Sequence, residues 1–361
     1  MNSDLHNDNP FDTTENIITN EIKPIQETQD GQQPPQPTKK ELRHDILTIC
    51  LALGAYIFSV NVLVVVIAAI AVAVNPDVQK MIINMAQSGG SLLSVTGNSE
   101  YLNAVSQVVA DVMGPAYIIS AVVSVLWMLT IRKKKLFTTD ITTIGQKVKP
   151  LVIAKILVLI WGVQFVSSMI TIILNSVLEK ADMSLTNAMQ QSMDMLFATP
   201  MGIAAVVFVL PVIEEIIFRG AIMRKLERYG TNFAIIVSSL LFAIYHMIWL
   251  QAFFAFFVGL LLAYTAKRFS IKWSMFLHIL NNGIAAIITI AGVSEMFEFG
   301  TMIACALASA VILIIGRNKI LLIKEQGAPN IAHPFKIALT HPMFIITAVI
   351  LLGIGALTLG M

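Results

Sequence analysis

The sequence predicts an all-α protein, namely a polytopic membrane helix bundle with about eight to nine transmembrane helices. Of the 361 residues, 56% are hydrophobic and only 13% are charged, whereas a soluble domain carries roughly 25% charged residues. Long apolar runs recur along the chain, and clusters of Lys and Arg lie between them. These observations indicate an integral, multi-pass membrane protein.

The elements follow from the apolar runs. Residues 1–40 are polar and rich in Gln, Asn and Pro. They cannot bury enough apolar surface to fold, so we expect a disordered cytoplasmic tail. A transmembrane helix needs about 20 apolar residues. Nine runs are candidate spans, although the sixth is short: 46–74, 113–131, 150–175, 201–223, 232–250, 252–266, 273–292, 300–316 and 343–361. We expect 75–112 to be the largest loop between them.

The positions of Lys and Arg predict the orientation of the bundle. Cytoplasmic loops carry an excess of these residues near the span ends. If the N-terminus is cytoplasmic, every basic cluster falls on one side of the membrane: 39–43, 132–135, 224–228, 267–272 and 317–336. We therefore expect a cytoplasmic N-terminus and a location in the plasma membrane. The basic residues form no face interleaved with aromatic residues, which argues against nucleic-acid binding.

Ionisable residues inside the spans need a specific explanation, because a charge at the bilayer centre costs a few kcal/mol. The segment LPVIEEIIFRGAIMRKLER at 210–228 places Glu214, Glu215 and Arg219 in an apolar run. Glu215 and Arg219 are four residues apart, so they share a helix face and can pair. Glu214 lies about 100° around the helix. Its carboxylate is therefore left to face another group.

Two later spans add imidazoles and an amide. His246 follows Phe242 by one turn in LLFAIYHMIW, and Asn282 follows His278 by one turn in WSMFLHILNNG. A carboxylate that converges with these groups suits peptide-bond hydrolysis, with the carboxylate as general base on a water and the imidazole and amide as oxyanion donors. Glutamate with two histidines is also a catalytic zinc set. The sequence thus leaves two options, no cofactor or a zinc ion held by Glu214, His246 and His278.

Three motifs carry a family resemblance. E-E-x-x-x-R at 214–219, F-x-x-x-H at 242–246 and H-x-x-x-N at 278–282 follow in this order on successive spans. Together they resemble the CPBP family of intramembrane proteases, also called the ABI family. That family includes CAAX prenyl-protein endopeptidases and bacteriocin-processing and self-immunity relatives. The resemblance marks 200–292 as catalytic core helices, between N-terminal transmembrane helices at 41–199 and C-terminal transmembrane helices at 293–361.

The resemblance implies an intramembrane endopeptidase that acts on a membrane-associated protein or peptide in the lipid bilayer. It implies that Glu214 is the general base and that His246 positions or activates the water. His278 and Asn282 would form the oxyanion side of the site. Glu215, Arg219 and Phe242 would bind substrate or support the site. Members have been called metalloproteases, but Asn282 is a poor zinc ligand and a good hydrogen-bond donor, which favours a mechanism without metal.

Two other functions stay open. A non-catalytic membrane scaffold or immunity protein of the same fold predicts that Glu214→Ala has no effect, whereas a protease would lose cleavage and keep its fold. A proton-coupled transporter could use Glu214 and the histidines as a relay. Transporters are often built from paired repeats. No repeat of the 200–292 pattern is present in 46–175, which argues against the transporter.

Overall fold

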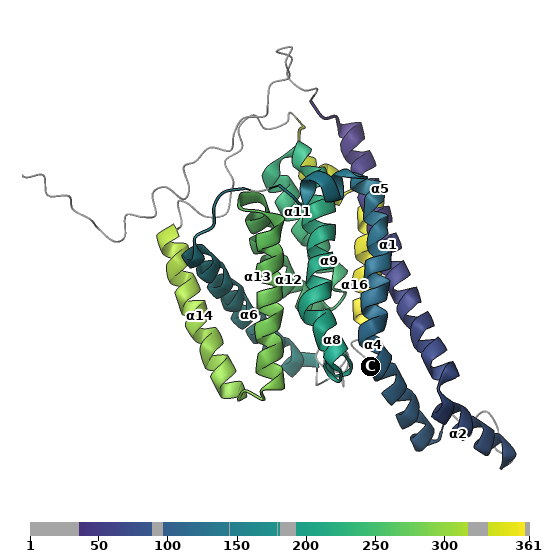
Figure 1. Cartoon of the computed structure of the whole chain (residues 1–361). Coiled ribbons are helices and arrows are strands. Elements are labelled where there is room, and N and C mark those ends of the chain that lie inside the picture. Colours follow the sequence, from purple (N-terminus) through teal and green to yellow (C-terminus); the bar gives the residue numbers. More distant parts are fainter. Residues whose placement is uncertain are drawn as a thin grey trace, which may run out of the picture.

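The computed structural model of the chain describes residues 36–88, 97–143, 145–178, 180, 193–316 and 331–357. All regular elements of this described part are helices, as Figure 1 shows, which confirms the all-α prediction. Six helical stretches are long and apolar enough to cross a membrane: Lys39–Val74, Ser99–Arg132, Pro150–Leu178, Pro200–Tyr229, Ile271–Ile290 and Glu295–Gly316. The protein is thus a multi-pass membrane protein, while the expected number of eight to nine spans is not confirmed.

The N-terminal helix α1 (Lys39–Val74) begins inside the segment that we expected to be disordered. Thr38 and Glu41 form a capping box, in which each side chain accepts a hydrogen bond from the backbone N–H of the other. With 36 residues, α1 is about 54 Å long and exceeds a hydrocarbon core of about 30 Å. Residues 1–35 of the predicted tail lie outside the described residues.

The expected loop at 75–112 is largely helical in its described part. Helix α2 (Pro76–Gln87) starts at an Asn75 cap followed by Pro, and α4 (Ser99–Ser124) starts at an Asn98 cap. The second span therefore begins well before residue 113. Polar residues in the first turns of α4 lower its local hydropathy, although asparagine caps are strong helix-start signals. A 3₁₀ segment η2 (Val125–Met128) and α5 (Leu129–Arg132) complete this span.

The helix that carries the two glutamates runs from Pro200 to Tyr229. Two of its sections are π-helical, and such stretches occur often at functional sites. Its parts are α8 (Pro200–Ala204), η5 (Ala205–Val209), α9 (Leu210–Glu215), η6 (Ile216–Met223), α10 (Arg224–Leu226) and η7 (Glu227–Tyr229).

The chain then folds back on itself inside the bundle. Helix α11 (Thr231–Tyr245) has 15 residues, so it is only about 23 Å long and shorter than the hydrocarbon core. His246 ends it, and Met247 adopts a positive φ of 58°. Helix α12 (Trp249–Arg268) then returns beside α11. The prediction that His246 lies within a span at 232–250 was therefore wrong in this detail, because the helix breaks at this residue.

The remaining helices complete the bundle. They are α6 (Pro150–Leu178), α13 (Ile271–Ile290), α14 (Glu295–Gly316), α15 (Pro334–Leu339) and α16 (Pro342–Leu357). Among the described residues, two apolar cores form: a large one that involves α1, α4, η6 and α11, and a smaller one that involves α6, α12 and α13. Helix α12 contributes to both, and the glutamate-bearing helix faces α13 beside it.

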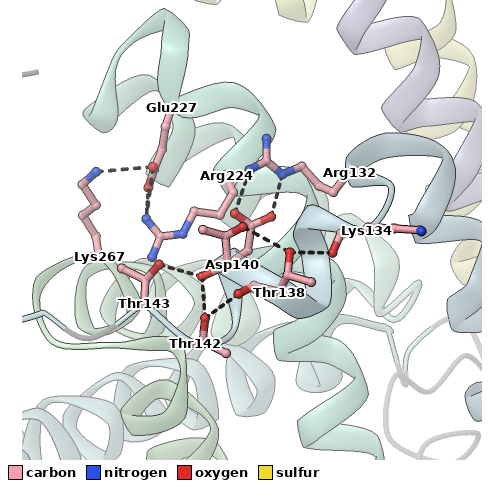
Figure 2. Close-up of polar contacts among 10 residues, drawn as sticks. Arg132, Lys134, Thr138, Asp140, Thr142, Thr143, Arg224, Glu227 and Lys267 are labelled. Carbon is pink, nitrogen blue, oxygen red and sulfur yellow. Dashed lines mark hydrogen bonds and ion pairs between the residues drawn. The ribbon is translucent and has the colours of Figure 1, made fainter. Parts of the chain in front are cut away.

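Ion pairs connect basic residues at several helix ends, and these ends lie at one end of the bundle, the upper end in Figure 1. Asp45 of α1 is buried, and it accepts hydrogen bonds from Arg228 at 2.7 Å and from Tyr229 at 2.8 Å. Figure 2 shows a second group, in which Arg132 donates twice to Asp140 at 2.7 Å. Asp140 ends the π-helical turn η3 (Leu136–Asp140), which packs on η6.

Candidate active site

Glu215 and Arg219 form a fully buried ion pair, with 3.0 Å between Glu215 Oε1 and Arg219 Nη1. The spacing of four residues predicted this contact. Arg219 Nη2 also donates to the Gly259 carbonyl oxygen of α12 at 3.0 Å. The guanidinium carbon lies 4.4 Å from the centroid of the Phe242 ring of α11. Three elements thus hold one cation, and this cation compensates the charge of Glu215 at a fully buried position.

Glu215 also fixes two side chains of α13. Ser274 Oγ lies 2.6 Å from Glu215 Oε2, and His278 Nδ1 lies 3.1 Å from Glu215 Oε1. An ionised carboxylate paired with Arg219 can only accept hydrogen bonds, so Nδ1 of His278 carries the hydrogen. Ser274 and His278 are one turn apart and share a helix face. Glu215 therefore orients the imidazole of His278.

Glu214 has a different environment from its neighbour. Its Oε2 lies 3.6 Å from His278 Nε2, and its side chain is 14% exposed, whereas the Glu215 side chain is fully buried. The two ring nitrogens of His278 thus face one carboxylate each. Sequence spacing alone left Glu214 without a defined partner, and the structure provides His278. Glu214 is the carboxylate of this pair that a ligand can reach.

Phe242 connects His246 to the same cluster. Its ring packs edge-on against His246 at a centroid distance of 4.7 Å and against His278 at 5.9 Å. His246 Nδ1 lies 2.8 Å from the Phe242 carbonyl oxygen, one of the last carbonyls of α11, which lack helical donors. A carbonyl only accepts, so Nδ1 carries the hydrogen and Nε2 keeps a lone pair. His246 therefore offers a hydrogen-bond acceptor.

Asn282 has a structural partner that the sequence did not reveal. Its Nδ2 donates to the Val206 carbonyl oxygen at 3.0 Å. In the π-helical η5, the Leu210 N–H bonds to the Ala205 carbonyl, and the next residue, Pro211, has no N–H. The Val206 carbonyl thus lacks its usual helical donors, and the amide of Asn282 replaces them. This bond uses one of the two Nδ2 hydrogens and leaves the other for a ligand.

The zinc option has no assembled ligand set in this geometry. Among the residues that the structure describes, no group of three or more His, Cys, Asp or Glu side chains is arranged to hold a metal ion. Both ring nitrogens of His278 face carboxylates, and Nδ1 of His246 faces a carbonyl. The metal-ligand role considered for Glu214, His246 and His278 therefore gains no support.

Sequence reasoning missed two partners of the buried ion pair. Ser274 could have been identified by its position one turn before His278, which places it on the same helix face. Gly259 contributes only its backbone oxygen, so no side-chain motif could reveal it. A Cβ at this position would come within 3.1–3.3 Å of Phe242 and Ser239. The absence of a side chain lets α12 approach α11 and brings this carbonyl to Arg219.

The fold and the site together define a class of protein. It is a polytopic helical membrane protein in which a buried Glu–Arg pair, a second, accessible glutamate and two histidines gather between the helices. Residues 196–284 match the family model described as type II CAAX prenyl endopeptidase, Rce1-like. All three motifs at 214–219, 242–246 and 278–282 fall inside this match.

The match covers 89 of the 361 residues and includes every candidate site residue. The resemblance seen in the motifs is thereby confirmed, and so is the expected enzyme class, an endopeptidase. The family that matches is one of endopeptidases, whose substrates are proteins or peptides. No curated protein and no solved structure matches the chain.

Proposed function

We propose that this protein hydrolyses peptide bonds of a membrane-associated protein or peptide by a glutamate-activated water. The contrast between the two glutamates carries the proposal. Glu215 is fully buried and bound to Arg219, Ser274 and His278, whereas Glu214 is partly exposed and faces only the imidazole among these groups. One carboxylate therefore builds the site, and the other is available for chemistry.

In the proposed reaction, the Glu214 carboxylate takes a proton from the water. The resulting hydroxide oxygen bonds to the carbonyl carbon of the substrate, and the carbonyl oxygen becomes an oxyanion. When the C–N bond breaks, Glu214 returns its proton to the leaving amine. His246 Nε2 accepts a hydrogen bond from the second O–H of the water, which orients the oxygen lone pair toward the carbonyl carbon. Glu214 ends the cycle ionised, so the protons balance.

The oxyanion is proposed to receive hydrogen bonds from His278 and Asn282. His278 Nδ1–H is already given to Glu215, so this role requires a second hydrogen on Nε2. Asn282 can use the Nδ2 hydrogen that Val206 does not take. One well-placed oxyanion donor contributes about 3–4 kcal/mol to the lowering of the barrier. The family's description suggests CAAX-type substrates, and a bacteriocin or self-immunity peptide is the other candidate from the resemblance.

The test is cleavage of quenched fluorescent peptides by purified protein in nanodiscs. One set carries a prenylated C-terminal CAAX sequence, and the other is an unprenylated random library. Wild type is compared with Glu214→Gln and His246→Phe, with and without a zinc chelator. Glu295→Gln is the matched control, because Glu295 is an exposed carboxylate at the start of α14.

We expect cleavage by wild type and by the control, unchanged by the chelator, and none by Glu214→Gln. Full activity of a folded Glu214→Gln would refute the mechanism. No cleavage of either set by a folded wild type would favour the scaffold or immunity function. Cleavage lost to the chelator and restored by zinc would overturn the metal-free reaction.

A further inference from the structure

Two tyrosines beside Glu214 have no role in the mechanism above. Tyr245 is the last residue of α11, and Tyr56 belongs to α1. Their rings are 6.1 Å apart between centroids, and their hydroxyl groups lie close enough to hydrogen-bond to each other. Both phenols also interact electrostatically with the Glu214 carboxylate. They thus form a hydroxyl pair within range of the proposed general base.

Aromatic packing fixes Tyr245 on one side of the site. Its ring contacts Phe218 at 5.4 Å and His246 at 5.5 Å between centroids. Phe218 follows Glu214 by four residues, so the two side chains project from neighbouring turns of one helix. His278 approaches Glu214 from α13, whereas Tyr245 approaches from α11 with Tyr56 of α1 behind it. Glu214 therefore faces an imidazole, and two phenols lie within electrostatic range of it.

Exposure separates the roles of the two tyrosines. Tyr56 is 1% exposed, and Phe218 is fully buried. Tyr245 is only partly buried, as are Glu214 and His246. Tyr245 thus keeps surface that a ligand can contact, whereas Tyr56 has almost none.

His278 and Asn282 have few hydrogens to donate to the oxyanion, and a phenol O–H can supply a further one. His278 can donate from Nε2 only when both nitrogens are protonated, and Asn282 gives one hydrogen to Val206. A tyrosine O–H is a donor that needs no change of protonation below its ordinary pKa of about 10. A hydroxyl hydrogen rotates to suit its partner, so either tyrosine can donate to the other. When Tyr56 donates to Tyr245 Oη, the hydrogen of Tyr245 is free to point at the substrate.

We propose that Tyr245 is a further catalytic residue, whose hydroxyl donates a hydrogen bond to the carbonyl oxygen of the scissile peptide as this oxygen becomes an oxyanion. Tyr56 is a positioning residue that acts through Tyr245. No covalent bond to either tyrosine forms or breaks. The assignment rests on the proposed function, because it concerns the same reaction at the same site.

The test measures kcat and KM separately for Tyr245→Phe and Tyr56→Phe with a peptide that wild type cleaves. Both changes remove one oxygen atom and keep the ring packing. Tyr264→Phe is the matched control, because Tyr264 is a partly buried tyrosine of α12 packed on the same large core. Circular dichroism and size-exclusion chromatography measure the folded fraction, so that kcat is expressed per folded molecule.

We expect Tyr245→Phe to lower kcat by about 10²–10³-fold with little change in KM, as the loss of one oxyanion donor does. Tyr56→Phe should lower kcat less, and Tyr264→Phe should leave it unchanged. The assignment would be overturned if the kcat of Tyr245→Phe stayed within about threefold of wild type. It would also be overturned if the loss of activity were explained entirely by a smaller amount of folded protein. If Glu214→Gln is inactive in that case, the protease mechanism stands alone. A folded wild type that cleaves nothing would overturn both.

Discussion

Replacing Arg219 with Met tests whether the buried ion pair stabilises the fold around the site. The change keeps an unbranched side chain but removes the guanidinium that faces Glu215, Gly259 and Phe242. Loss of one partner of a buried pair costs about 3–5 kcal/mol, because the other charge stays buried and uncompensated. Arg219 Nε and Nη1 make no aligned hydrogen bond within the described structure. We therefore expect the lower end, about 3 kcal/mol.

The free energy of unfolding can be measured in mixed micelles by titration with SDS, with helicity as the signal. A loss of about 3 kcal/mol lowers the ratio of folded to unfolded protein more than about 100-fold, since each 1.4 kcal/mol is a factor of ten. Lys80→Met on α2 is the control. Its ion pair with Asp77 is 75% and 80% exposed at the two side chains, and exposed pairs contribute at most about 1 kcal/mol.

A double variant separates charge from packing. If the loss arises from an uncompensated carboxylate, then adding Glu215→Gln to Arg219→Met should restore part of the stability, and the two changes will not be additive. The reasoning would be refuted by an Arg219→Met loss below about 1 kcal/mol. It would also be refuted by a double variant whose loss equals the sum of the single losses.

Three further predictions follow from other contacts. Ser274→Ala removes the 2.6 Å partner of Glu215 Oε2 and should cost about 1–3 kcal/mol of unfolding free energy and lower kcat; unchanged values of both would contradict its proposed support of the site. Asp45→Asn weakens the charge-assisted bonds at one end of α1 and should cost about 1.5–3 kcal/mol, measured by the same SDS titration; a neutral result would show that this end is held by packing alone. Gly114→Ala places a Cβ against the backbone of a neighbouring helix and should cost about 1–3 kcal/mol of unfolding free energy. Gly54→Ala in α1 meets nothing within 4 Å and should be neutral or stabilising by about 0.5–1 kcal/mol. Equal effects of the two substitutions would disprove the steric account.

Local sequence patterns predicted much of the site. Glu215 and Arg219 could be paired from their spacing, because side chains four residues apart share a helix face. Phe242 and His246 were expected to share a face for the same reason, and in the structure the imidazole lies against that ring and carbonyl. The contact of His278 with both glutamates could not be predicted in this way. It depends on how α13 packs against α9, which no spacing within one helix determines.

Span counting was less successful, for a physical reason. Hydropathy measures the composition of a run and does not detect where one helix ends and the chain turns back into the next. The apolar run at 232–250 includes most of the 15-residue helix α11 and the first residues of α12. Its composition therefore predicted one span where two helices meet. For α4 the error was the opposite: its first turns are polar, so the predicted span began later than the helix, which starts at Ser99.

The sequence by itself determined that this is a multi-pass helical membrane protein and which ionisable residues are energetically costly in a bilayer. It also determined the family model that residues 196–284 match. These features depend on composition and on periodicity along one helix. Only the tertiary structure decided that His278 faces both glutamates, that Ser274 binds Glu215, and that Tyr245 packs against Phe218. Those roles depend on distances between helices far apart in the chain, and packing of side chains between helices sets such distances.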